Sequence, residues 1–306
     1  MSYPLGALSA EKNGKSRTCE CVICGYKTRG PSAHDLGRVR GNTERFCRTL
    51  FQLWKCPKCL TIHSVEDVDL EDIYRDYPLN NRQLDIFARG TLRNLLQRLV
   101  RGGLKKTDTI IDFGCGNGVL IEYLERQGFI DVAGYDPFVP EYASLPQDQE
   151  LYDCVVANDV IEHCDDPRAM MRDCLELVKP GGLFYVGTAD SQGVENMNDL
   201  EPHIMRLHQP FHRVIITQES LFALGLEYSL EPIATYQRSY MDTLRPFINY
   251  RFLDEFSKAL DHNMDLALDP ASGIVVLRKP KLLFYAFFGY FFPSAYEPAV
   301  LWRRSL

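Results

Sequence analysis

The sequence predicts an α/β fold in which helices cover both faces of a mainly parallel sheet. Three observations lead to this prediction. From about residue 108, short apolar segments rich in β-branched residues alternate with segments of helical periodicity. The first of these apolar segments runs directly into a glycine-rich turn. A cysteine-rich stretch precedes the alternation and indicates a small N-terminal subdomain.

The chain has 306 residues, which is enough for one large core and an appendage. Residues 1–110 hold 19 Lys and Arg against 12 Asp and Glu, whereas residues 111–306 hold 15 against 29. The basic N-terminal part suits an anionic partner, although ordinary solvated faces explain it equally well. No apolar stretch resembles a secretory signal or a membrane-spanning helix, so we expect a cytoplasmic protein.

The cysteine-rich stretch contains two matched pairs, Cys21 and Cys24, then Cys56 and Cys59. Each Cys-x-x-Cys knuckle directs two thiolates toward one point, and two knuckles complete the tetrahedral sulfur shell that Zn²⁺ prefers. Residues 49–55 read as a strand that carries the second knuckle. The sequence therefore predicts a zinc ribbon with a structural Zn²⁺ within residues 1–78.

Other ligand sets are left open at this metal site. Cys19 and Cys47 compete as thiol ligands, and His63 competes as an imidazole ligand. The 31 residues between the knuckles exceed what a compact ribbon needs. We expect this arginine-rich insertion to loop out, and its basic residues are Arg38, Arg40, Arg45 and Arg48.

The alternation that follows predicts the elements in order. A short helix over residues 69–77 ends at a proline. The remaining elements of the first half are a helix at 81–101, a strand at 108–113, a helix at 117–127, strands at 130–136 and 152–158, a helix at 166–178 and a strand at 182–188. Only fifteen residues separate Asp136 from Tyr152, so a third strand at this edge is vestigial.

The glycine-rich turn indicates a nucleotide-like cofactor. Gly114, Gly116 and Gly118 follow a strand and open a helix, where bare N–H groups face outward. Asp136 ends the next strand, eighteen residues after Gly118, and suits the two hydroxyls of a ribose. The third glycine comes one residue too early for the dinucleotide pattern.

This G-x-G-x-G turn after an acidic strand end resembles class I S-adenosylmethionine (SAM)-dependent methyltransferases. Residues 152–163, which end in Glu162-His163, resemble the fourth strand of that family, and Leu177–Val186 resembles its Leu-Lys-Pro-Gly-Gly turn. The resemblance covers roughly residues 80 to 240. It implies a Rossmann-like sheet. An N-terminal zinc ribbon before this domain is similar to the order in sugar and natural-product methyltransferases.

The resemblance also implies the residues around the cofactor. It places Asp112 and the glycine turn around the methionine and ribose end of SAM. Asp136 is expected to bind the ribose hydroxyls, and Asn158 to lie beside the methyl group that is transferred. Tyr74 and Tyr77 are candidate lid residues, with two ordinary packed tyrosines as the alternative. The cofactor residues expected are Asp112, Gly114, Cys115, Gly116, Gly118, Asp136, Asn158 and Tyr77.

Methyl transfer to a hydroxyl, an amine or an acidic carbon requires removal of a proton. His163 suits the base by its place after the fourth strand and by its pKa range. A packing role near the cofactor is the alternative for His163, and His212 and His208 are the next candidates. Glu162 is expected to be a structural partner.

The second half of the chain predicts strands near 233–236 and 273–277, with a helical insertion at about 239–269 that caps the substrate. We therefore divide the chain into a ribbon and linker at 1–78, a catalytic domain at 79–280 and an aromatic tail at 281–306. Seven of the eleven residues 282–292 are aromatic. Four roles are open for this tail: packing against its own domain, a wall of an apolar substrate pocket, a homo-oligomer contact and peripheral membrane contact.

The expected function is methyl transfer to a small molecule: a sugar, a natural product or a lipid-linked metabolite. An RNA methyltransferase is the alternative enzyme, and the net charge of −14 on residues 111–306 argues against it. A non-catalytic zinc protein that binds SAM is the third hypothesis. The sequence leaves the acceptor and the methylated atom open.

Overall fold

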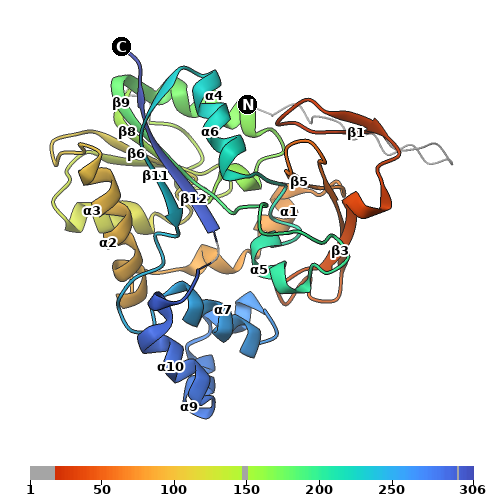
Figure 1. Ribbon diagram of the computed structural model, residues 1–306. Helices are drawn as coiled ribbons and strands as arrows, with labels where there is room; N and C mark the ends of the chain where they lie inside the picture. Colours follow the sequence, from red (N-terminus) through yellow and green to blue (C-terminus); the bar gives the residue numbers. More distant parts are fainter. Residues whose placement is uncertain (1–17, 147–150, 295) are drawn as a thin grey trace.

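The computed structural model describes residues 18–146, 151–294 and 296–306. A mixed six-stranded sheet forms its centre, in the order β11-β12-β9-β8-β6-β7 (Figure 1). Strands β6 to β9 run parallel to one another, and β12 runs antiparallel to both β9 and β11. The strands are β6 (Ile110–Phe113), β7 (Val132–Tyr135), β8 (Tyr152–Asn158), β9 (Val178–Gly187), β11 (Leu230–Arg238) and β12 (Tyr296–Arg304).

Successive residues of these strands enter two different cores, as the two-residue period of a strand requires. Ile111 and Val155 pack in the core beneath α4 (Pro167–Leu177) and α6 (Gln218–Glu227). Their neighbours Ile110 and Val156 pack in the opposite core, beneath α2 (Ile86–Arg101) and α3 (Val119–Arg126). The predicted α/β fold, with helices on both faces, is confirmed (Figure 1).

The edge of the sheet beside β7 agrees with a vestigial third strand. No described strand pairs with the outer side of β7. Residues 137–142 instead turn back on themselves, and the N–H of Asp136 donates to the carbonyl of Tyr142 at 2.9 Å. The described part of this connection therefore supplies a short loop next to the strand end.

The antiparallel end of the sheet corrects one expectation. The strand predicted at 273–277 is wrong, because this segment forms helix α9 (Ile274–Arg278). The β-branched pair Val275 and Val276 suggested a strand, but Val276 packs instead into a small helical core. The missing strand is β12, whose four consecutive residues 299–302 are buried between β9 and β11.

The helical insertion is longer than the predicted 239–269. It begins with α7 (Tyr250–Ala259) and α8 (Met264–Leu268) and continues through α9, α10 (Pro280–Phe288) and the 3₁₀ helix η6 (Gly289–Phe291). These elements, called the cap below, project below the sheet in Figure 1. The shorter 3₁₀ turns of the chain are η1 (Ala33–Asp35), η2 (Pro78–Asn81), η3 (Ile161–His163), η4 (Glu201–His203) and η5 (Pro270–Gly273).

The N-terminal subdomain consists of a hairpin and a small antiparallel sheet. The hairpin is β1 (Thr18–Glu20) with β2 (Lys27–Arg29). The sheet has the order β10-β5-β4-β3. Its strands are β3 (Leu36–Arg40), β4 (Leu50–Lys55), β5 (Ile62–Ser64) and β10 (Val214–Ile215), and the last of these comes from the α/β part of the chain.

The arginine-rich segment between the knuckles does not loop out as expected. It forms β3 and the turn before β4, and two of its arginines are paired. Arg40 binds Glu201 at 2.7 Å and Asp261 of the cap at 2.9 Å. Arg45 binds Asp72 of α1 (Leu70–Tyr74). The segment therefore ties the N-terminal subdomain to the cap.

Candidate functional site

The glycine turn between β6 and α3 is tightly packed at two of its positions and open at the third. All three glycines have positive φ angles, of 79°, 53° and 79° for Gly114, Gly116 and Gly118. A Cβ atom on Gly114 would lie 2.4 Å from the side chain of Val160, and one on Gly118 would lie 2.5 Å from the Tyr142 hydroxyl. A Cβ on Gly116 would meet nothing within 4 Å. The middle of the turn therefore faces open space.

Asp136, at the end of β7, is hydrogen-bonded across to this turn. Its Oδ2 accepts from the N–H of Gly116 at 2.9 Å, and its Oδ1 accepts from the N–H of Phe138 at 2.9 Å. Burial raises the pKa of Asp136, although the bonds from these main-chain groups oppose the shift. The carboxylate is thus fixed at the open side of the turn.

Asp112 is the penultimate residue of β6, just before the turn, and is almost completely buried. Burial first, and the nearby Asp136 carboxylate second, raise its pKa to about 7. Asn158 lies at the corresponding end of β8, where its Nδ2 donates to Asp159 at 2.8 Å. The carboxyl ends of three adjacent parallel strands therefore bring Asp112, Asp136 and Asn158 to one edge of the sheet.

The predicted catalytic histidines meet in one aromatic cluster. The rings of His163 and His212 are perpendicular, with centroids 4.7 Å apart. Tyr74 bonds the Nδ1 of His163 at 2.6 Å, and Tyr77 bonds the Nε2 of His208 at 3.1 Å. This cluster connects two parts of the chain. One is η3, which follows the end of β8, and the other is the segment between α5 (Ile204–Leu207) and β10.

One ring contact connects the histidine cluster with the Asp136 edge. Tyr74 stacks on Phe138, with ring centroids 4.4 Å apart and planes tilted by 8°. Phe138 follows Asp136 by two residues, and Tyr74 belongs to the short helix α1. This helix therefore packs against the loop that follows β7. Tyr74 therefore lies against the loop that follows Asp136, and its role as a lid residue stays a prediction.

Burial keeps the clustered histidines uncharged. It lowers the pKa values of His163 and His208 to well below the usual value of 6.5, and the neighbouring His212 lowers both further. Burial also lowers the pKa of His212 to about 4, against a hydrogen bond to the carbonyl of Arg206. At neutral pH each ring therefore offers one unprotonated nitrogen.

Glu162 has the structural role that the sequence predicts. Its Oε1 accepts from the N–H of Ala189 at 2.9 Å, and its main-chain carbonyl accepts from the N–H of Arg213 at 2.6 Å. Burial raises the pKa of Glu162 to about 7. The residue thus joins the end of β8 to the segments that follow β9 and precede β10.

Sequence reasoning missed two partners of this cluster. Asn42 accepts a hydrogen bond from the Nδ1 of His208 at 2.6 Å, and Phe138 provides the stacking surface for Tyr74. Asn42 belongs to a Gly-Asn-Thr turn of the N-terminal subdomain, and no local pattern predicts its distant partner. Phe138 was detectable in principle, because it lies just beyond the acid that ends β7.

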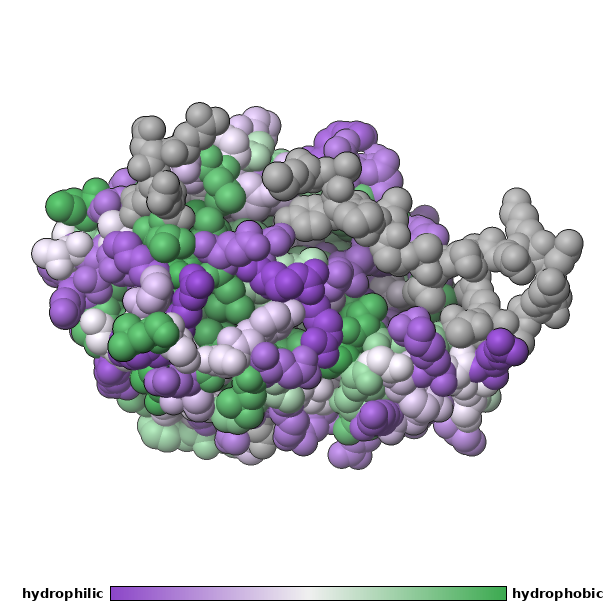
Figure 2. All heavy atoms as spheres, turned by 90° about the horizontal axis from the view of Figure 1, so that it is seen from above, coloured by the Kyte–Doolittle hydropathy of each residue, from purple (hydrophilic) through white to green (hydrophobic). Residues whose placement is uncertain are grey.

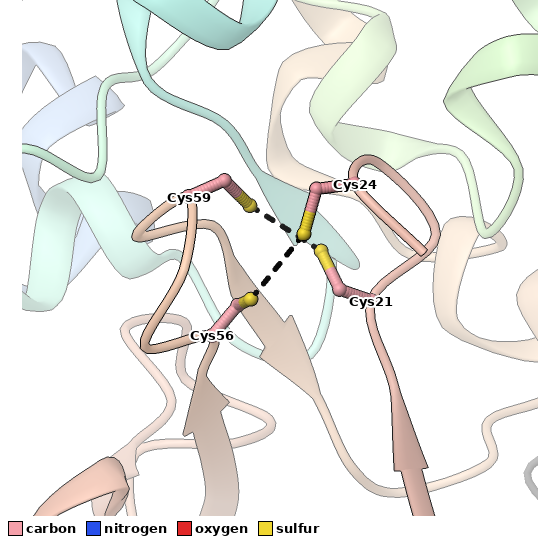
Figure 3. Close-up of side chains that lie close together, drawn as sticks. All are labelled: Cys21, Cys24, Cys56 and Cys59. Carbon is pink, nitrogen blue, oxygen red and sulfur yellow. Dashed lines mark hydrogen bonds between the residues drawn. The ribbon is translucent and has the colours of Figure 1, made fainter. Parts of the chain in front are cut away.

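The four predicted cysteines form one cluster, shown in Figure 3. The Sγ atoms of Cys21, Cys24, Cys56 and Cys59 all lie within 4.8 Å of one another. Those of Cys21 and Cys59 are 3.4 Å apart, and those of Cys24 and Cys56 are 3.6 Å apart. Sulfur atoms held about 2.3 Å from one tetrahedral Zn²⁺ lie roughly 3.8 Å apart, so this donor set fits zinc.

The two knuckles have the same backbone turn. The N–H of Gly25 donates to the carbonyl of Cys21, and the N–H of Leu60 donates to the carbonyl of Cys56, both at 2.9 Å. Gly25 and Leu60 have φ angles of 68° and 62°. The turn of each knuckle, rather than any distant contact, therefore aims its pair of sulfur atoms.

The competing ligands are excluded by their positions. His63 is not a member of the cluster, and its Nε2 instead bonds the sulfur of Cys21 at 3.3 Å. Cys47 donates to the carbonyl of Glu44. Cys19 is buried beside the knuckle, outside the set of four. His63 is held in turn by stacking on Trp54, with ring centroids 5.1 Å apart.

The four-cysteine cluster is joined to the α/β part by hydrogen bonds as well as by packing. Arg168 of α4 donates to the carbonyls of Val22 and Ile23, at 3.2 and 2.6 Å, and also pairs with Glu227 of α6 at 2.6 Å. Cys21 and Cys56 lie in the same core as the strands of the large sheet. The four-cysteine centre and the sheet therefore form one packed body.

Comparison with known proteins identifies similar sequences. Residues 84–231 match the family model described as "Methyltransferase domain". The ubiquinone biosynthesis O-methyltransferase of Caulobacter vibrioides is 34% identical over 102 residues, which are 26% of this chain and 40% of that protein. The enzyme of the same description from Aliivibrio fischeri is 30% identical over 135 residues, which are 34% of this chain and 57% of that protein. The chain thus spans only about half of these relatives.

Solved structures with a similar arrangement include two methyltransferases. Coclaurine N-methyltransferase, bound to N-methylheliamine and SAH, is 15% identical with a TM-score of 0.40 and covers 70% of this chain and 72% of its own. The plantazolicin methyltransferase BpumL, in complex with SAH, is 13% identical with a TM-score of 0.42 and covers 76% and 90%.

Proposed function

We propose that this chain, whose residues 84–231 form a class I SAM-dependent methyltransferase domain, transfers a methyl group from SAM to a small-molecule acceptor. The arrangement of Asp136 and the glycine turn supports the proposal most directly. A fixed carboxylate stands beside a turn whose middle glycine borders open space. The carboxylate offers hydrogen-bond acceptors to ribose hydroxyls, and the open space over Gly116 admits the rest of the donor.

We propose the following roles for the residues around the donor. Asp136 binds the ribose hydroxyls, Asp112 and the main chain of residues 114–118 hold the methionine end, and Asn158 lies beside the reactive methyl group. Tyr77 belongs to the lid that excludes water. Bound SAM supplies a methyl group on a sulfonium centre, and the protein must hold the acceptor in line with that group.

Asp136→Ala tests the donor site. The variant should bind SAM at least about tenfold more weakly by calorimetry, because a charge-assisted pair of hydrogen bonds is lost. Asp131→Ala is the matched control, since Asp131 is exposed at the other end of the same strand. Equal SAM affinity in the two variants would remove Asp136 from the donor site.

We propose that His163 accepts the proton of the substrate when the methylated group is a hydroxyl. The Tyr74 hydroxyl at Nδ1 favours the form in which this nitrogen is unprotonated, and the main chain of Phe211 faces the opposite side of the ring. The acceptor's proton then reaches Nδ1 of His163 through the Tyr74 hydroxyl, which gives its own proton to Nδ1 and takes the acceptor's proton in exchange. His212, perpendicular to His163, is the second candidate for this role.

His163→Asn tests this assignment. With an acceptor that the wild type methylates, release of S-adenosylhomocysteine (SAH) should fall by roughly a hundredfold or more, and SAM affinity should be retained. His203→Asn is the control, because His203 lies in the nearby η4 and outside the cluster. Since burial lowers the pKa of His163 well below its usual value, kcat at saturating SAM should show no loss from protonation of this ring between about pH 8 and pH 6. Unchanged turnover in the variant would leave His163 with a packing role.

We propose that the acceptor is a hydroxyl-bearing small molecule. The relatives' names describe O-methyltransferases, and each clustered histidine has an unprotonated nitrogen at neutral pH that can accept a proton. An RNA acceptor has less support, because Arg40 and Arg45 of the basic N-terminal part are engaged in ion pairs. Measuring SAH release with a panel of phenols, sugars and lipid-linked alcohols identifies the class of acceptor. Retention of the protein on a heparin column would restore the RNA alternative.

We propose that Cys21, Cys24, Cys56 and Cys59 hold a structural Zn²⁺. A shell of four protein sulfurs leaves no open position for a substrate, so the metal stabilises the fold. His63 and Thr61 bond two of the sulfurs, at 3.3 and 3.1 Å, as outer partners of such a shell. Elemental analysis of the purified chain should find one zinc per molecule, and its absence would reject this site.

A further inference from the structure

The cap presents an exposed apolar surface on its outer side. Helix α10 buries Leu282 and Ala286 against Phe252 of α7 and Val276 of α9. Its opposite side carries large apolar groups that remain exposed. We call this surface the cap tip, and it consists mainly of Ile274, Leu277, Phe284, Phe287, Phe288 and Phe291.

The exposure of the cap tip is high and continuous along the helix. Leu277 is 76% exposed, Phe291 72% and Phe288 52%. Phe284, Phe287, Phe288 and Phe291 are spaced by three or four residues, which places them on one side of α10 and η6. By contrast, hydrophobic and hydrophilic residues are mixed over the opposite end of the molecule, seen in Figure 2. An apolar concentration of this kind marks a contact surface.

Basic residues border the cap tip, and acidic residues are missing from its sequence. Residues 270–296 contain Arg278, Lys279 and Lys281 and no Asp or Glu, although the whole chain carries a net charge of −7. Lys281 pairs with Glu255 at 2.7 Å. Arg278 and Lys279 are exposed, and neither forms an ion pair within the described residues. The junction of α9 and α10 therefore offers two cations beside the aromatic rings.

We infer that the cap tip docks on an anionic lipid bilayer. Exposed aromatic and aliphatic side chains bordered by Lys and Arg suit the interface between headgroups and acyl chains. Helix α10 has nine residues, and no helix in the described ranges is long and apolar enough to cross a membrane. The tip therefore lies on the bilayer and does not span it. The inference does not depend on the proposed methyl transfer.

Charge disfavours a second copy of the chain as the occupant. A two-fold contact through the cap tip places the same surface of both copies face to face. Arg278 and Lys279 of one copy would then approach those of the other, with no acidic residue in the segment to offset them. A surface of anionic headgroups provides the missing negative charge.

The cap tip is fixed relative to the strand edge that holds the proposed site. Arg238, in β11, donates to the carbonyls of Tyr290 and Phe292 at 3.0 and 3.2 Å. Asn249 donates to the carbonyls of Tyr285 and Ala286, and the N–H of Phe247 donates to the latter. Docking of the tip therefore sets the orientation of the whole molecule on the bilayer.

Vesicle flotation of the full chain tests the inference, without SAM or acceptor. We expect binding to vesicles of phosphatidylcholine with phosphatidylserine, weaker binding to phosphatidylcholine alone, and weakening by salt. Leu277→Gln with Phe288→Gln should lower the partition coefficient at least about tenfold. Ile130→Gln with Leu226→Gln is the control, because these residues are 88% and 52% exposed elsewhere.

A second pair of variants separates charge from apolar contact. Arg278→Glu with Lys279→Glu should abolish the preference for anionic vesicles, whereas Arg101→Glu with Arg172→Glu, which changes the net charge equally, should keep it. Circular dichroism and SAM affinity confirm that each variant is folded. Failure of the wild type to float, or a dimer in sedimentation that the Leu277 and Phe288 substitutions dissociate, would overturn the inference. Either result would leave the test of Asp136 unaffected.

Discussion

Leu60 occupies a backbone position that usually favours glycine. Its φ angle of 62° matches the 68° of Gly25 at the corresponding place in the other knuckle. A left-handed conformation disfavours any residue with a Cβ atom by roughly 1 kcal/mol. The second knuckle therefore holds a strained residue that its hydrogen bond to Cys56 keeps in place.

Substitution of these two residues should change the free energy of unfolding in opposite directions. Gly25→Ala should lower the free energy of unfolding by about 1 kcal/mol, purely through the backbone, because an added Cβ meets nothing within 4 Å. Leu60→Gly should be neutral or raise it by up to about 1 kcal/mol. Urea unfolding of the zinc-loaded protein measures both. A loss of stability in Leu60→Gly would show that its side-chain contacts outweigh the strain.

At the scale of elements, α4 connects the four-cysteine cluster to the sheet. Arg168→Gln removes the bonds to the carbonyls of Val22 and Ile23 and the ion pair with Glu227. We expect the free energy of unfolding to fall by about 1–2 kcal/mol and zinc to be lost faster to a chelator. Arg172→Gln, exposed on the same helix, should change neither quantity. Unaltered chelation kinetics in Arg168→Gln would confine the role of this residue to stability.

The elements that the sequence predicts well are those with local signals. The span of β8 is the one predicted, and the glycine turn, both knuckles and helix α4 lie within a few residues of their predicted places. The segment at 273–277 shows the limit of such signals. A run of β-branched residues suits a strand, yet a strand also needs a partner, and β12 already occupies that place in the sheet.

The same limit applies to the proposed site. Asp112, Asp136 and the turn could be proposed from the sequence because they lie at the carboxyl ends of adjacent parallel strands. The sequence identified the histidines of the cluster only as separate candidates and did not predict that they contact one another. Its assembly depends on contacts such as that between Asn42 and His208, 166 residues apart, which no period or motif records.

At the scale of the whole molecule, the sheet depends on β12. Removal of residues 296–306 would leave β9 and β11 without their common partner and would delete the fully buried Leu301 and Trp302. We expect the shortened chain to aggregate, because two long strand edges become exposed. Removal of Ser305 and Leu306 alone should leave a soluble protein with an unchanged melting temperature. A soluble, SAM-binding product from the larger deletion would contradict this prediction.

The position of β12 also constrains how the protein is made. β9 and β11 leave the ribosome before the strand that joins them, so both must wait with unpaired edges while the cap is being synthesised. The N-terminal subdomain waits as well, because β10 completes its small sheet only after most of the central strands have emerged. Neither sheet can therefore close in step with translation, and the newly made chain depends on late, long-range pairing to become a single body.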